Sequence, residues 1–166
     1  MEDKVNDQYS LVKELKTQST WKLFLFTILT LGIYYVHYIK KQSIIINKYM
    51  DNKNKISDIG VRMLMGFTYF NVILVLINSF SFTHANAIIL DYISWILFIM
   101  IIIWGYTAKN RLNEYSKLDK SSAYWFHGLW TFLFTPFYFN YNINCFYQKV
   151  LNLENEDKLN KEKRVS

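Results

Sequence analysis

Two long apolar segments dominate the pattern of hydrophobic and polar positions along the chain. No charged residue lies between Arg62 and Asp91, or between Asp91 and Lys109. Each window approaches the roughly 20 apolar residues that a transmembrane helix needs, and a short polar turn separates the two. The pattern therefore predicts a transmembrane helical hairpin with spans at about 61–82 and 88–107.

A shorter apolar segment before this hairpin is interrupted. As a helix, residues 21–31 would cross only about half of a roughly 30 Å hydrocarbon core, and Gly32 follows at once. Glycine accepts the left-handed conformation that ends a helix, so residues 33–49 can return as an amphipathic helix. We expect a re-entrant or interfacial helix-turn-helix over about 20–50, with its turn covered by protein. One short, tilted transmembrane helix through Gly32 is the alternative.

The same arrangement recurs near the end of the chain. Residues 19–39 align without gaps on residues 123–143, and Gly32 then falls opposite Pro136. Proline also interrupts a helix, because it lacks the backbone donor and disfavours helix in the residue before it. We therefore expect a second broken helix over about 122–150. Residues suited to N-cap positions precede both copies: Ser19, Thr20, Ser121 and Ser122.

The first copy carries a specific motif, W-x8-T-L-G-I-Y-x-x-x-Y, which begins at Trp21, continues from Thr30 to Tyr34 and ends at Tyr38. This motif resembles that of a family of small bacterial inner-membrane proteins of unknown function. Members of that family commonly show the motif around a pair of spans, sometimes twice. The second copy departs from it at Pro136. The resemblance implies a bacterial inner-membrane protein and implies no activity.

The distribution of charge predicts the orientation. Ten of the 19 lysine and arginine residues lie from Lys4 to Arg62 and nine from Lys109 to Arg164, all on one side under the hairpin arrangement, so the positive-inside rule places both termini in the cytoplasm. If both broken segments crossed the membrane fully, the fold would be a four-span bundle with basic residues on both faces, which the rule disfavours. The charges that determine this topology are Lys40, Lys41, Arg62, Lys109 and Arg111. The expected interfacial anchors are Trp21, Tyr34, Tyr38, Trp104, Trp125 and Tyr138.

Composition agrees with a membrane protein. Hydrophobic residues make up 52% and aromatic residues 19% of the chain, more than a soluble domain of this size can bury. We expect one integral-membrane domain over 1–150 and a charged cytoplasmic tail over 151–166. Because Cys145 is the only cysteine, one chain can form neither an internal disulfide nor a cysteine-based zinc site. The net charge of +6 is scattered beside apolar segments, so nucleic acid is not an expected partner.

Polar residues inside the first span are the main candidates for function. Asn71 and Asn78 lie two helical turns apart, on one face. Since an unpaired amide in hydrocarbon costs several kcal/mol, we expect both to contact protein, across the hairpin or in another subunit. Lining of an oligomeric pore is the functional alternative. The three histidines, His37, His84 and His127, are expected to be interfacial residues rather than metal ligands.

No phosphate-binding, zinc or acyl-transfer motif occurs in the sequence. We therefore expect a non-catalytic inner-membrane protein without a cofactor, acting as an assembly, scaffold or sensing component. Its expected partners are membrane lipids and either further copies of itself or a membrane complex. An oligomeric channel or pore that alters permeability is the alternative function, and a lipid-modifying enzyme has the least support.

Overall fold

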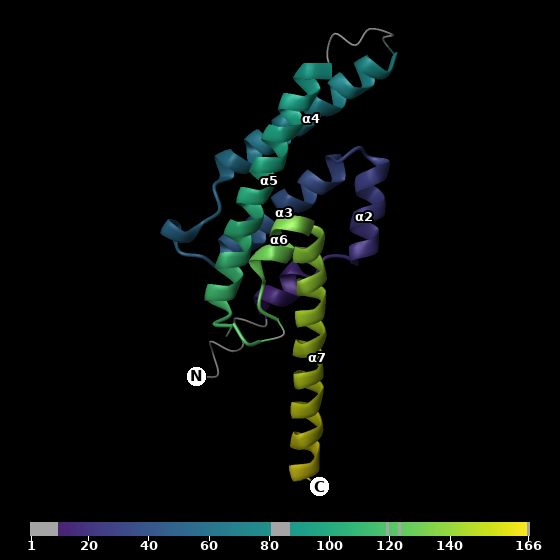
Figure 1. The fold of residues 1–166 in the computed structure, drawn as a ribbon. Coiled ribbons are helices and arrows are strands. Elements are labelled where there is room, and N and C mark those ends of the chain that lie inside the picture. Colours follow the sequence, from purple (N-terminus) through teal and green to yellow (C-terminus); the bar gives the residue numbers. More distant parts are fainter. Residues whose placement is uncertain (1–9, 81–86, 119, 123, 166) are drawn as a thin grey trace.

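The computed structural model describes residues 10–80, 87–118, 120–122 and 124–165. Every regular element in these ranges is helical, which confirms the predicted all-helical fold for this part of the chain (Figure 1). The elements are α2 (Thr20–Leu29), α3 (Ile33–Lys48), the 3-10 turn η1 (Asn52–Asn54), α4 (Asp58–Phe80), α5 (Ala87–Tyr115), α6 (Gly128–Phe134) and α7 (Phe137–Val165).

The helices α4 and α5 run side by side toward one end of the molecule (Figure 1). Both are long and apolar enough to cross a membrane, and only 22% and 17% of their apolar windows are buried inside the structure. The core helix of a soluble protein would be mostly buried. Here Phe70, Trp95 and Ile103 are 50%, 65% and 61% exposed, so the hairpin presents its apolar side chains outward.

The ends of the hairpin helices differ from the predicted spans. The first helix begins at Asp58, because Ser57 Oγ caps it by accepting a hydrogen bond from Gly60 N at 3.2 Å. The second continues to Tyr115, about two turns past the predicted end, because no glycine or proline stops it after the apolar window. Lys109 and Arg111 therefore lie on the helix itself. The polar turn with His84 lies outside the described residues.

The first helix break lies at Gly32, and two residues form it. Gly32 N donates to Thr27 O at 2.8 Å and Leu31 N donates to Ile28 O at 3.2 Å, the hydrogen bonds of a Schellman motif. Both residues at the turn are left-handed, with φ 50° at Leu31 and 92° at Gly32. The sequence predicted a left-handed glycine; it did not predict that a leucine takes the first left-handed position.

The second break lies at Pro136, where α6 ends and α7 begins after a cis Thr135–Pro136 peptide bond. The predicted serine N-cap for this copy is wrong: His127 is the N-cap residue of α6, which has only 7 residues. Ser122 instead closes a turn: its Oγ accepts a hydrogen bond from Tyr124 N at 3.2 Å, and its carbonyl accepts one from Trp125 N at 3.0 Å.

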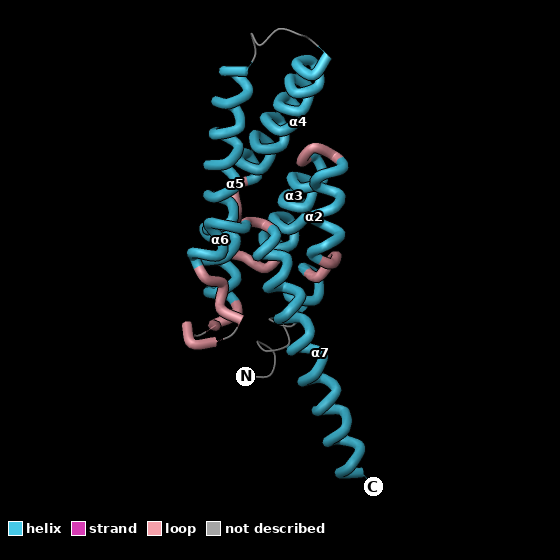
Figure 2. Tube along the Cα trace, turned by 45° about the vertical axis from the view of Figure 1, so that its right-hand side comes forward, coloured by secondary structure: helices cyan, strands magenta, loops and turns pink. Residues whose placement is uncertain are grey.

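The core lies at the base of the hairpin, where α3 packs on α4 and α6 packs on α5 (Figure 2). Ile39, Leu112, Phe126 and Ile143 are completely buried there. The helical residues 10–15 contribute Leu11 and Leu15 to this core, and Val12 packs in a smaller cluster with Phe146 and Val150. From this core α7 extends as one helix away from the other elements, and it includes the tail that the sequence separated at residue 151.

Candidate functional site

The two helix breaks meet in the structure. Tyr35, in the first turn of α3, donates a hydrogen bond from its hydroxyl to Thr135 O at 2.7 Å. The rings of Tyr35 and Phe137 also contact, with centroids 5.7 Å apart. Thr135 lies directly against Gly105 of α5, where an added Cβ would be 2.4 Å from Thr135 Cγ2. The turn at Pro136 is therefore held between α3 and α5.

The second broken helix also contacts the beginning of the first through side chains of α7. Asn140 Nδ2 donates to Gln18 O at 3.3 Å and to Thr20 Oγ1 at 3.1 Å, and Asn144 Nδ2 donates to the same hydroxyl at 3.4 Å. These amides lie one turn apart on α7 and reach the start of α2. The two broken helices thus interlock, each contacting the other near its turn or its beginning.

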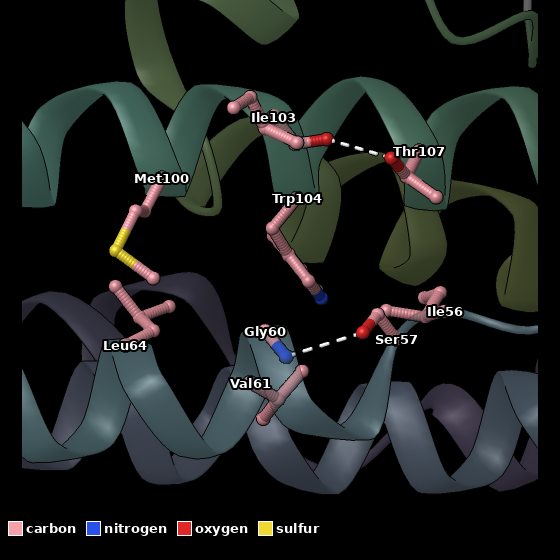
Figure 3. A pocket seen from close by; sticks show the side chains of 9 residues that line it. All are labelled: Ile56, Ser57, Gly60, Val61, Leu64, Met100, Ile103, Trp104 and Thr107. Atoms are coloured by element: carbon pink, nitrogen blue, oxygen red, sulfur yellow. Dashed lines mark hydrogen bonds between the residues drawn. The ribbon is translucent and has the colours of Figure 1, made fainter.

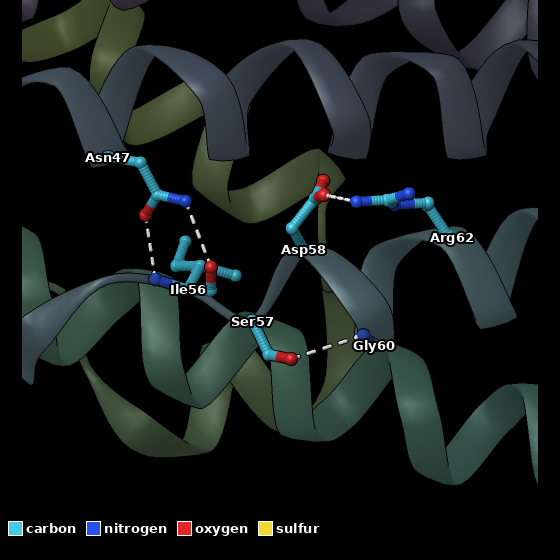
Figure 4. Close-up of polar contacts among 6 residues, drawn as sticks. All are labelled: Asn47, Ile56, Ser57, Asp58, Gly60 and Arg62. Carbon is cyan, nitrogen blue, oxygen red and sulfur yellow. Dashed lines mark hydrogen bonds and ion pairs between the residues drawn. The ribbon is translucent and has the colours of Figure 1, made fainter. Parts of the chain in front are cut away.

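Asparagine side chains fix both loops that lead back into the helical body. Asn47 Nδ2 donates to Ile56 O at 2.9 Å and Asn47 Oδ1 accepts from Ile56 N at 2.6 Å (Figure 4). Asn113 forms the same pair with the backbone of Phe126, at 3.2 and 3.0 Å. Sequence reasoning missed these residues. A signal was present, because α3 and α5 end in the similar strings INKY and LNEY.

A basic and aromatic pocket lies between α2 and α3. It has a volume of about 290 Å³, and its lining residues include Gln18, Lys22, Tyr34, His37, Tyr38 and Lys41. Two hydrogen bonds fix its walls: Tyr34 hydroxyl donates to Gln18 Oε1, and His37 Nε2 lies 2.6 Å from the hydroxyl of Tyr69 on α4. A shallower cavity shares His37 and Lys41 and continues to Lys40. We call the first of these cavities the basic pocket.

Tyr38 is the most deeply buried residue of the basic pocket. The residue is 4% exposed, and its hydroxyl has no hydrogen-bond partner among the described residues. An unpaired buried hydroxyl costs about 1–3 kcal/mol, so this group has an unused capacity to donate or accept a hydrogen bond. The sequence predicted Tyr38 as an interfacial anchor, and the structure places its ring inside the protein.

A second, apolar cavity of about 220 Å³ lies between the bases of α4 and α5 (Figure 3). Met100 and Leu64 face each other at one end of it, and Trp104 points into the space between the helices. Trp104 is 4% exposed, and its Nε1 donates to Ser43 Oγ on α3 at 2.8 Å. Its ring therefore packs inside the protein, whereas the sequence predicted an outward anchor. The apolar lining offers little to orient a polar ligand.

The remaining predicted anchors differ in exposure. Trp21 is 81% exposed and Trp125 is half-buried. Tyr138 is half-buried, and its hydroxyl accepts a hydrogen bond from His127 N at 3.1 Å. Tyr34 is half-buried at the basic pocket. The aromatic residues of the second copy thus pack partly against their own helix pair.

The charges expected to determine topology lie at the base of the hairpin and on α3. Arg62 pairs with Asp58 one turn before it (Figure 4), and Arg111 Nη1 lies 3.5 Å from Glu114 Oε2. Lys109 Nζ lies 5.2 Å from the ring centroid of Tyr106. Lys41 lines the basic pocket, Lys40 lines the adjoining cavity, and both side chains are exposed.

The amides of Asn71 and Asn78 are half-buried on α4. No hydrogen bond joins either side chain to another described residue, and Asn71 Nδ2 and Asn78 Oδ1 are buried without a partner there. The structure thus brings neither amide into a bond across the hairpin. Nor does the described part of the chain contain a cluster of three His, Cys, Asp or Glu residues that could hold a metal ion.

No family model matches the chain, and no similar curated protein or solved structure was found. The family resemblance of the motif at Gly32 therefore stays a prediction.

Proposed function

We propose that the protein is a non-catalytic integral protein of the bacterial inner membrane, with both termini in the cytoplasm, that acts as an assembly, scaffold or sensing component. The observation that carries this proposal is the outward apolar surface of the α4–α5 hairpin. The charge distribution supports the orientation, because none of the 19 basic residues lies between Arg62 and Lys109.

The lengths of the broken helices support two spans rather than four. α2 has 10 residues and α6 has 7, so at about 1.5 Å per residue they extend about 15 Å and about 10 Å. Neither could cross a roughly 30 Å hydrocarbon core. Each is followed after the turn by a second helix, α3 or α7, that runs back from it (Figure 2), as a re-entrant element requires.

Membrane fractionation tests the first part of this proposal. After alkaline carbonate washing, the full-length protein should stay in the membrane pellet and sediment with inner-membrane markers on a density gradient. Release into the supernatant would contradict an integral hairpin, and sedimentation with outer-membrane markers would contradict the location.

The assembly role is supported by α7, which projects beyond the other helices and carries exposed polar residues such as Asn152 and Asn155 (Figure 1). A photo-crosslinking amino acid at Asn155 should give a discrete adduct with one protein in intact cells. The same probe at Asn110, which is exposed at the base of α5, is the control. Absence of any adduct along α7, or the same adducts at both sites, would count against the scaffold role.

An oligomeric channel is the second candidate, and the unpaired amides of Asn71 and Asn78 favour it. Two spans cannot enclose a pore, so several copies would have to bring these amides together. Ion flux into liposomes should then disappear in Asn71→Leu/Asn78→Leu and persist in the control Asn152→Leu. Wild-type flux no higher than that of empty liposomes would exclude this function.

A further inference from the structure

We propose that the basic pocket between α2 and α3 binds a phosphate group, supplied by the headgroup of an anionic phospholipid. This inference deepens the proposed membrane function and rests on it only for the lipid as the source of the phosphate. Three features of the pocket carry the inference: its charge, its unpaired hydroxyl and the apolar surface next to it.

The charge of the pocket favours an anion. Lys22 comes from the first turn of α2 and Lys41 from α3, so two separate helices each contribute a lysine to the lining of one cavity. None of its lining residues is acidic, and neither lysine forms an ion pair with a described residue. A cavity that is lined by cations and has no negative charge to balance them attracts anions.

The hydrogen-bonding groups suit phosphate oxygens. Phosphate offers several strong acceptors, and the pocket supplies ammonium, imidazole, phenol and amide groups that can donate. Tyr38 lines the pocket, and its buried hydroxyl has no partner among the described residues, so this group can still donate a hydrogen bond. His37 is fixed by its contact with Tyr69, so the pocket wall is connected to the long helix α4.

The surroundings favour a lipid rather than free phosphate. Lys22 Nζ lies 5.8 Å from the ring centroid of Phe26, and the rings of Phe26 and Tyr34 lie 5.1 Å apart. Tyr34 lines the pocket, and Phe26 lies next to it on α2, where Leu29 nearer the turn at Gly32 is 67% exposed. An acyl chain has an apolar surface to follow there, while Lys40 adds positive charge in the adjoining cavity, which shares His37 and Lys41 with the pocket.

Affinity measurements on the full-length protein in a neutral detergent test the site. The probes are short-chain phosphatidylglycerol, phosphatidylcholine of the same chain length and inorganic phosphate. The variants are Lys22→Gln/Lys41→Gln, Tyr38→Phe, and the control Lys53→Gln/Lys55→Gln, which removes the same charge from the exposed loop around η1. Because Lys22 and Lys41 are exposed and Tyr38→Phe keeps the ring, circular dichroism should be unchanged.

We expect the wild type to bind phosphatidylglycerol more tightly than phosphatidylcholine. Each lysine near an anionic lipid is worth about fivefold, so Lys22→Gln/Lys41→Gln should lose about 25-fold in affinity. Tyr38→Phe should lose affinity without a change of charge, and the control pair should change it less than about twofold. Equal losses in the pocket pair and the control pair, or no loss in either pocket variant, would overturn the site.

The two sources of phosphate and the two proposals are separable. If inorganic phosphate competes fully and the lipid shows no advantage, the site binds soluble phosphate, and the lipid assignment is overturned. If phosphatidylglycerol binds as expected but carbonate releases the protein from membranes, the site stands and the integral-membrane function fails. If the protein is retained in the membrane but binds none of the probes, the phosphate site is overturned and the integral-membrane function stands.

Discussion

The second helix break packs tightly against the hairpin at Gly105. A Cβ there would lie 2.4 Å from Thr135 Cγ2, 2.7 Å from Thr135 Oγ1 and 3.1 Å from Thr135 Cβ, all shorter than an ordinary contact. Threonine is stiff about χ1, and Thr135 Oγ1 donates to the carbonyl of Thr131, so the side chain cannot rotate away freely. Gly105→Ala should therefore push the turn at Pro136 away from α5.

The size of the effect follows from two opposing terms. Overpacking of a close-packed site costs about 1–3 kcal/mol. Alanine in a helix interior gains about 0.5–1 kcal/mol over glycine. We expect Gly105→Ala to lower the free energy of unfolding by about 1–2 kcal/mol. Reversible unfolding in mixed micelles of a neutral detergent and sodium dodecyl sulfate, followed by tryptophan fluorescence and circular dichroism, measures this change.

Gly66→Ala on α4 is the matched control. Nothing lies within 4 Å of a Cβ added at Gly66, so this variant should be neutral or slightly more stable. Adding Thr135→Ala to Gly105→Ala removes the two nearest atoms and should recover part of the lost stability, a coupling typical of residues in contact. If Gly105→Ala is as stable as Gly66→Ala, or if Thr135→Ala recovers nothing, the close packing of this turn on α5 is refuted.

Two further predictions concern groups outside this contact. Asn113→Ala leaves the buried backbone N–H and carbonyl of Phe126 unpaired, and should lower the free energy of unfolding by about 2–3 kcal/mol in the same assay. A loss below about 1 kcal/mol would contradict this role of the two hydrogen bonds. A hydrogen bond from Lys48, which has the larger effect, and one from Tyr49 lower the pKa of Glu14. Their stabilisation is present above the usual glutamate pKa of about 4.3 and is lost as the pH falls through the lowered pKa. Titrating stability with pH should show this loss in the wild type and not in Glu14→Gln, and equal profiles would contradict it.

The features of the fold that local chemistry determines were predictable from the sequence. The charge-free windows predicted two long apolar helices, and the structure contains them. Ser19 was expected as a cap, and its Oγ accepts a hydrogen bond from Lys22 N at 3.3 Å. Gly32 and Pro136 were expected to interrupt helices, and helices end at both positions in the structure. Each of these features depends on residues within one or two turns of each other.

Features that depend on distant partners were not predictable. Gln42 and Ser43 are buried on α3, although a polar residue in an amphipathic pattern is expected to face outward. Ser43 is buried because Trp104 donates to it from another helix. The basic pocket was missed for the same reason, since Lys22 and Lys41 belong to different helices and only the turn at Gly32 brings them together.

In the proposed topology the chain crosses the membrane twice, and neither broken helix crosses it. Single-cysteine accessibility in intact cells tests this most directly, in a Cys145→Ser background with probes at Asn52, Asn86 and Ser121. With an impermeant thiol reagent, only the probe at Asn86 should react in intact cells, and all three should react once the cells are permeabilised. Reaction of the probe at Asn52 in intact cells would mean that the chain crosses the membrane before α4, and the two-span topology would then be wrong.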